Sequence, residues 1–249
     1  MARSASRLRC VAVATGALAL AVPLAGCTTT QHEAQRVQLD SARLRAALKS
    51  TRVTVANATV APTSVATVTA GGRTAFVIKV RNGGRKAVSD LPISVGYERA
   101  DRTKAYLNAS VDLNYFQAHL PVIAAGGSLT WVYTVSSHAL PSRARLFAMV
   151  GTRPSPPALL TETNVRIGLD VGYVTGARSV TVHLDNPSSV PQYQLQVYAY
   201  ARRGRRYAAA GNLTVADLGA GSKQRVRVPL VGVVPSANLH VEAIPTILQ

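Results

Sequence analysis

The sequence has almost no cysteine. Cys10 and Cys27 are the two cysteines among 249 residues, and both lie near the N-terminus. If the chain is cut ahead of Cys27, one thiol remains and no internal disulfide can form. A disulfide-stapled fold is then excluded, and Cys27 is a buried thiol, a reactive thiol or an attachment point.

Charge is missing from the segment before Cys27. Residues 11–24, VAVATGALALAVPL, carry none, whereas residues 1–10 hold Arg3, Arg7 and Arg9 and no acid. A basic stretch followed by a short apolar one is typical of a secretory signal. As a helix the apolar stretch would be about 21 Å long, short of a hydrocarbon core of about 30 Å. An uncleaved membrane helix is therefore the weaker interpretation.

The residues that end this segment are Leu24-Ala25-Gly26-Cys27. They resemble the lipobox of bacterial lipoproteins, in which a thiol takes a diacylglyceryl group as a thioether. The resemblance implies cleavage after residue 26, lipidation of Cys27 and an extracytoplasmic protein held at the cell membrane by this lipid. Acylation also explains the single remaining thiol. The alternative is an ordinary signal peptide cut elsewhere, with Cys27 incidental.

Acidic residues are scarce, at 11 against 28 basic ones. Loss of Arg3, Arg7 and Arg9 leaves 25 basic residues and a net charge of +14. Such a charge favours anionic partners: acidic lipid headgroups, phosphate-bearing wall polymers or nucleic acid. No nucleic-acid recognition motif is present, so nucleic acid is not expected. Because the arginines are scattered, a basic surface without a dedicated partner is the alternative.

Local catalytic and metal-binding motifs are also lacking. The sequence contains no GxSxG, HExxH, P-loop or DxDxDG pattern. No metal-type spacing relates its histidines, at positions 32, 119, 138, 183 and 240. We therefore predict a protein that is not an enzyme and has no metal or cofactor. A triad assembled only in space remains the alternative.

What the sequence does contain is short β-rich runs. Residues 27–51 come first, a tether in which 31–50 lack Pro and Gly and form either a short amphipathic helix or a frayed linker. From residue 52 on, apolar residues alternate with polar ones, which indicates strands with one buried face. The alternating sets include Thr74-Phe76-Ile78-Val80, Leu91-Ile93-Val95-Tyr97, Val180-Val182-Leu184 and Leu195-Val197-Ala199.

The two halves look alike. In 77–100 and in 180–203 a strand ends at an Asn, Asn82 or Asn186, and a polar turn leads to the next strand. Gly-Ser turns at 125–128 and 219–222 precede closing strands. We infer one β-module used twice, in 52–150 and 164–249, joined by a Pro-rich linker at 151–163. The first module is expected to contain one longer loop, at residues 101–120.

This pattern resembles the immunoglobulin-like sandwiches of bacterial surface proteins, and the first module is most similar to the CARDB type. The resemblance implies an all-β fold of two tandem immunoglobulin-like β-sandwiches. It implies no function.

One segment, 192–211, predicts a binding face. Its inward residues are Leu195, Val197 and Ala199, so the residues between them face outward. In an immunoglobulin-like strand order, the outward residues of the last two strands, including His240 and Glu242, would lie on the same outer face. The predicted face consists of Gln194, Gln196, Tyr198, Tyr200, Arg202, Arg225 and Arg227. Aromatic rings beside amides and guanidinium groups can stack on sugars or bind acidic polymers. The alternative is an ordinary exposed sheet face.

The expected function is a non-catalytic binding or scaffolding module at the envelope, for a protein or an anionic wall polymer. The alternative is an accessory carbohydrate-binding lipoprotein that serves an envelope hydrolase or transporter.

Overall fold

The computed structural model describes residues 37, 52–110, 113–136, 140–141, 144–152, 170–176, 178–234 and 238–246. These residues are all-β, as the sequence predicts, apart from helical Val37 and one short 3-10 helix. The predicted signal segment, Cys27 and most of the predicted linker lie outside the described residues. Of the tether, Val37 is described, and it is exposed.

The strands are 2 to 13 residues long and all pair antiparallel. The first half holds β1 (Val60–Ala70), β2 (Arg73–Asn82), β3 (Leu91–Glu98), β4 (Lys104–Tyr106), η1 (Tyr115–Gln117), β5 (His119–Leu120), β6 (Ser128–Ser136) and β7 (Arg145–Val150). The second holds β8 (Asp170–Gly176), β9 (Ser179–Asp185), β10 (Gln192–Arg203), β11 (Arg206–Leu218), β12 (Lys223–Pro229), β13 (Val231–Gly232) and β14 (Leu239–Ile244). The predicted loop 101–120 thus includes β4, η1 and β5.

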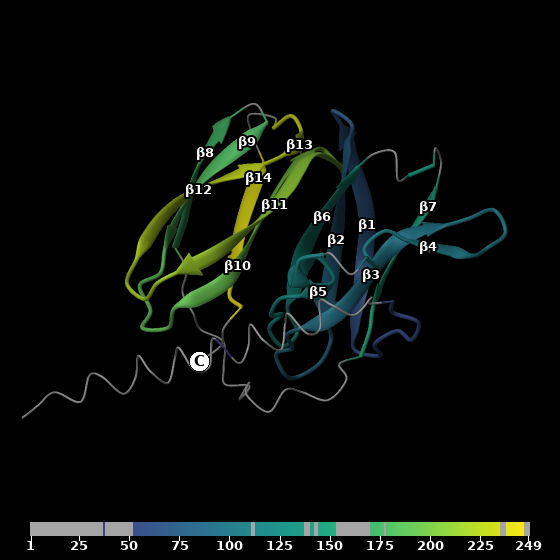
Figure 1. Cartoon of the computed structure of the whole chain (residues 1–249), viewed down its shortest axis with the longest axis horizontal. Helices are drawn as coiled ribbons and strands as arrows, with labels where there is room; N and C mark the ends of the chain where they lie inside the picture. Colours follow the sequence, from purple (N-terminus) through teal and green to yellow (C-terminus); the bar gives the residue numbers. More distant parts are fainter. Residues whose placement is uncertain are drawn as a thin grey trace, which may run out of the picture.

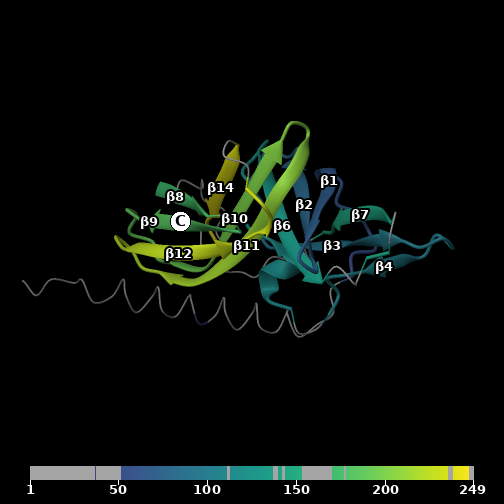
Figure 2. The same cartoon turned by 90° about the horizontal axis from the view of Figure 1, so that it is seen from above.

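Four sheets lie in successive layers (Figures 1 and 2). The first is β4-β3-β5, with β7 also paired to β3, and the second is β1-β2-β6. The third is β13-β11-β10-β14, and the fourth is β12-β9-β8. We call the first two layers the first sheet pair and the last two the second sheet pair.

Each sheet pair encloses a core of alternating apolar residues. In the first, Phe76 and Trp131 are completely buried, and Trp131 Nε1 donates to the Phe116 carbonyl at 3.2 Å. In the second, β9 and β10 contribute Val182 and Leu195, which are also completely buried. The predicted inward sides of these strands are therefore confirmed.

β2 is buried on both faces. Phe76 and Ile78 face the first core, but Ala75 and Val77, on the opposite side of the strand, are equally inaccessible. They are covered because the second and third layers pack against each other, so that Tyr198 of β10 joins the first core cluster. A strand between two layers reads as a nearly continuous apolar run, as Ala75 to Ile78 does.

Two buried asparagines make matching hydrogen-bond sets. The Asn82 amide nitrogen donates to the carbonyls of residues 86, 123 and 124, at 2.8, 3.3 and 3.1 Å. That of Asn186 donates to those of residues 190, 218 and 219, at 2.9, 3.3 and 3.1 Å. Each side-chain oxygen accepts a backbone N–H two residues further on. Asn82 therefore joins the end of β2 to the turn before β6. Asn186 joins the end of β9 to the turn before β12 in the same way.

Candidate functional site

The centre of the predicted binding face is not at the surface. Gln196 and Tyr198 are each 1% exposed, because the outer side of β10 packs against the β1-β2-β6 sheet. Thr130 and Thr134 of β6 bond across this contact, to the Tyr200 hydroxyl and to Asn212 of β11, both at 3.3 Å. The prediction of an exposed aromatic face on β10 is therefore wrong.

Within the contact, Tyr200 is the most connected side chain. Its hydroxyl donates to Glu242 Oε1 at 2.9 Å and accepts from Thr130 Oγ1. Its ring stacks on that of His240, with centroids 5.2 Å apart. Burial, opposed by the Thr130 hydrogen bond and reinforced by Glu242, raises the pKa of Tyr200 to about 12. These groups serve to join the sheet pairs.

Tyr198 differs from Tyr200. Its hydroxyl is buried and has no hydrogen-bond partner among the described residues. Burial, with a smaller contribution from the Glu242 charge, raises the pKa of Tyr198 well above its ordinary value. A buried donor without a partner costs stability, so this phenol is a weak point of the contact.

The two ends of the predicted β10 face reach solvent. Gln194 is half-buried and has a φ of +53°, whereas the register shift of the β10–β11 pair lies at the other end, between Ala201 and Arg202. Arg202 is exposed, with its guanidinium carbon 5.1 Å from the centre of the Tyr207 ring. They lie at opposite ends of β10 and do not form one site.

Arg225 and Arg227 are on the other side of the second core. They belong to β12, which pairs with β9 and not with β10. The prediction that they share a face with Tyr198 and Tyr200 is therefore wrong. Both arginines are exposed, so the prediction that they face outward is confirmed. The prediction that β12 lies in the same sheet as β10 is wrong.

β12 presents a row of cations to solvent. Lys223, Arg225 and Arg227 lie at every second position of the strand and are all exposed. Lys223 forms an ion pair with Asp185 at 2.7 Å, and Arg227 Nε donates to Ser179 Oγ at 2.9 Å. The middle residue, Arg225, lies opposite His183 of β9. Neither Arg225 nor His183 has a side-chain partner within the described chain.

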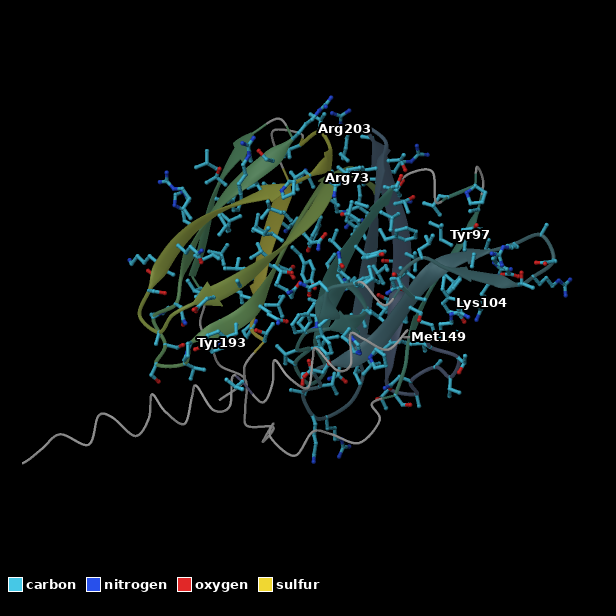
Figure 3. All side chains as sticks on the ribbon, in the orientation of Figure 1. Arg73, Tyr97, Lys104, Met149, Tyr193 and Arg203 are labelled. Atoms are coloured by element: carbon cyan, nitrogen blue, oxygen red, sulfur yellow. The ribbon has the colours of Figure 1, made fainter. Side chains whose placement is uncertain are left out.

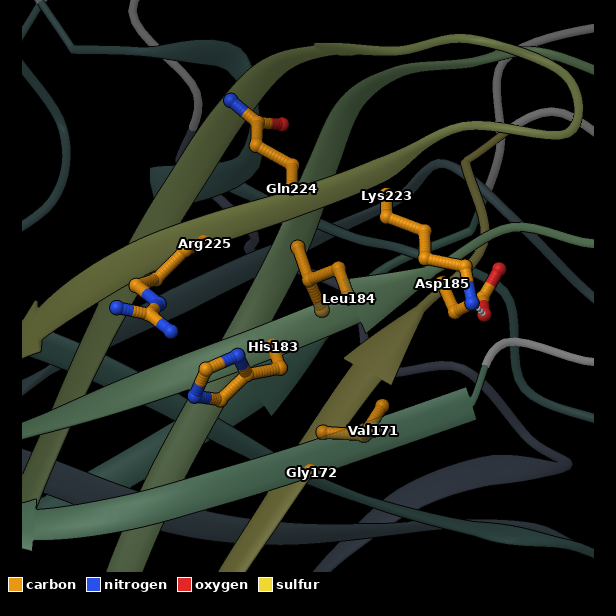
Figure 4. A pocket seen from close by; sticks show the side chains of 8 residues that line it. All are labelled: Val171, Gly172, His183, Leu184, Asp185, Lys223, Gln224 and Arg225. Atoms are coloured by element: carbon orange, nitrogen blue, oxygen red, sulfur yellow. Dashed lines mark ion pairs between the residues drawn. The ribbon is translucent and has the colours of Figure 1, made fainter.

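This pair borders an open hollow of about 640 Å³ (Figure 4). Gly172 of β8 lies opposite His183 and leaves its floor without a side chain. The hollow is lined by Val171, Gly172, His183, Leu184, Asp185, Lys223, Gln224 and Arg225. Asp185 is already neutralised by Lys223, so the free charge facing the hollow is positive. The arrangement suits an anionic group, for which a guanidinium offers two parallel donors.

In the described part of the chain, no three His, Cys, Asp or Glu side chains are placed to hold a metal ion. Nor does any helix in that part have the length and apolarity needed to cross a membrane.

His183 is the functional candidate that sequence reasoning missed. In the sequence it is one of five histidines without metal-type spacing, and nothing local marks it as part of a site. Its pairing with Arg225 depends on the register of β9 against β12, across a sequence separation that no local pattern specifies.

Comparison with known proteins adds no assignment. No protein-family model matches the chain, and no curated protein matches its sequence. Among solved structures, red sea bream transglutaminase is similar over 77% of this chain and 30% of that chain, at 10% identity and a TM-score of 0.23. At that score the similarity carries no argument about function.

Proposed function

We propose that this protein is a lipid-anchored extracytoplasmic module, without a catalytic role, that binds an anionic wall polymer. The binding surface is the outer face of β12 and β9, with Arg225 and His183 at its centre. The observation that carries the proposal is the unpartnered Arg225–His183 pair beside the hollow, flanked by Lys223 and Arg227. A polymer phosphate would supply the anionic partner that the Arg225 guanidinium lacks.

The proposed architecture is two tandem immunoglobulin-like sandwiches. Support comes from the Asn82 and Asn186 networks and from strand order, because β1-β2-β6 and β8-β9-β12 have the same connectivity. When the carbonyls that accept from the two asparagines are aligned, Thr130 of the first repeat is equivalent to Arg225 of the second, and Val132 is equivalent to Arg227.

That correspondence supports a ligand-binding role for β12. Thr130 and Val132 are buried where the first sheet pair packs against the second. At the same positions of the second sheet pair the chain has exposed arginines. A terminal repeat needs a polar outer face to stay soluble, and here that face is cationic and hollowed, which favours an anionic ligand over another sheet.

The carbohydrate-binding alternative loses its structural support. Its stacking residues were to be Tyr198 and Tyr200, which lie in the contact between the sheet pairs. Tyr198 is fully buried, and Tyr200 is partly buried and held by Glu242 and Thr130, so the two rings do not form one exposed stacking surface, and we do not carry that function further.

Binding to a purified phosphate-bearing wall polymer, measured against salt concentration, tests the proposal. The variant Lys223→Gln/Arg225→Gln/Arg227→Gln should bind far more weakly, and the slope of log K against log salt should fall by about two to three. The control Arg202→Gln/Arg203→Gln/Arg205→Gln removes the same charge from the β10–β11 hairpin and should change binding little. If both variants lose affinity equally, the polymer recognises net charge and not this face.

A further inference from the structure

The tether enters the described structure at the end opposite β12. Residues 52–57 lie on the outer face of the first layer, where the Val53 N–H donates to Ser94 Oγ at 2.8 Å. The Asn57 N–H donates to the Val150 carbonyl at 2.7 Å, and the Asn57 side chain to the Gly151 carbonyl at 3.2 Å. These bonds fix the point at which the predicted anchor connects to the body.

Cations and aromatic rings meet at this point. The Arg52 guanidinium carbon lies 5.9 Å from the centre of the Tyr106 ring, and Lys104 Nζ lies 5.3 Å from that of Phe147. The two rings contact edge to face, with centroids 5.5 Å apart and planes at 83°. Figure 3 labels Lys104 of β4 and Met149 of β7, the two strands that pair with β3 at this end of the molecule. The cluster combines half-buried apolar surface with charges held at its rim.

The charge at this end is positive. Five exposed basic residues lie on the face or on its protruding hairpin: Arg52, Arg99, Arg102, Lys104 and Arg145. Two acids accompany them, Glu98 and Asp101, which leaves an excess of three positive charges. Arg145 contacts Glu98 at 3.5 Å. Hydrogen bonds from Thr103 hold the pKa of Asp101 below its ordinary value.

We propose that this face, formed by Arg52, Lys104, Arg145, Tyr106 and Phe147, docks on an anionic lipid surface. Basic residues attract acidic headgroups, and aromatic rings with attached cations suit the boundary between headgroups and acyl chains. The proposal concerns a different face from the polymer site and does not depend on it.

The length of the tether makes this contact accessible. From Cys27 to Arg52 there are 25 residues, which span about 38 Å as a helix and at most about 85 Å when extended. A lipid on Cys27 would therefore hold the face at a high effective concentration beside the bilayer.

Docking would also orient the polymer site. Stacked sheets are about 10 Å apart, so the first and fourth layers are separated by about 30 Å. With the first layer on the membrane, the β12 face points outward toward the wall (Figure 2).

The test uses residues 27–249 with Cys27→Ser, so that no acyl chain contributes. Sedimentation with phosphatidylcholine vesicles is compared with and without phosphatidylglycerol. The variant Arg52→Gln/Lys104→Gln/Arg145→Gln should bind the anionic vesicles roughly 100-fold more weakly, at about fivefold per basic residue. The control Lys223→Gln/Arg225→Gln/Arg227→Gln loses the same charge and should bind them nearly as well as the parent.

A second readout measures orientation directly. An environment-sensitive dye on Ala100→Cys, in the β3–β4 hairpin, should change its emission on adding anionic vesicles. The same dye on Gln224→Cys, on β12, should not. If the parent chain ignores anionic vesicles, or if the two variants lose vesicle binding equally or in reverse order, the proposal is wrong. It is also wrong if the first variant loses wall-polymer binding and keeps vesicle binding. Loss of polymer binding by the β12 variant tests the proposed function separately.

Discussion

Thr130 and Tyr200 are 70 residues apart in the chain, and their hydroxyl oxygens lie 3.3 Å apart. This hydrogen bond crosses from the second layer to the third, where Tyr198 and Val77 are also buried. The two sheet pairs therefore share apolar surface and polar contacts, and they should behave as one body. That rigidity lets opposite ends of the molecule present two separate basic faces.

The contrast between Tyr198 and Tyr200 predicts opposite effects of the same substitution. Tyr198→Phe removes a buried hydroxyl that lacks a partner among the described residues, and should raise the free energy of unfolding by about 1 kcal/mol. Tyr200→Phe removes the bonds to Glu242 and Thr130 and should lower it by about 1 kcal/mol. Denaturant unfolding of both variants measures this. Equal destabilisation would mean that the Tyr198 hydroxyl is satisfied.

Alkaline pH should weaken the folded state. Burial raises the pKa of Tyr133 to about 12. The pKa of Tyr200 is also raised to about 12, mainly by burial. In the unfolded chain both phenols have a pKa near 10.0. Their contribution is complete below about pH 10 and is lost as pH rises toward 12, because the unfolded state releases protons first. Unfolding midpoints across this window, with Tyr200→Phe showing a smaller decline, check the prediction. A constant midpoint would contradict it.

The matching asparagines should have matching importance. Asn82→Ala and Asn186→Ala each remove three hydrogen bonds donated to turn carbonyls and one accepted from a backbone N–H, and each should cost about 3 kcal/mol of unfolding free energy. Gln224→Ala, at an exposed position of β12, should change it by less than about 0.5 kcal/mol. Denaturant titration distinguishes these values, and a mild effect at one asparagine would weaken the proposed equivalence of the two networks.

The anchor prediction concerns Cys27, outside the described residues. In cells, a Cys27→Ser chain should appear in the soluble fraction, whereas the parent should sediment with membranes and incorporate labelled fatty acid. A Cys27→Ser chain that stays membrane-bound and is cleaved as before would contradict lipidation at this residue.

The strands were predictable from sequence because their signal is local. Alternation in Leu195, Val197 and Ala199 identified the inward side of β10. The same alternation placed Tyr198 on the other side, but it does not say whether that side meets water or another sheet. The apolar run from Ala75 to Ile78 in β2 was a sign that two layers cover the strand.

The site was less predictable because it depends on which strands pair. Arg225 was correctly placed on an outward parity, yet its sheet is set by pairing with β9, whose residues precede it by about 40 positions. Arg225 and Arg227 therefore lie on one side of the second core and Tyr198 and Tyr200 on the other, although all four were predicted to face outward. Strand order carries this information, and it is a property of the whole fold.

Backbone chemical-shift mapping, by titrating the labelled protein with a short phosphate-bearing wall-polymer fragment, tests the central claim most directly. We predict shifts concentrated at His183, Arg225 and their neighbours in β8, β9 and β12, with none at Tyr198 or Tyr106. Shifts confined to β3, β4 and β7, or no shifts at low salt, would contradict the assignment of the polymer site to this face.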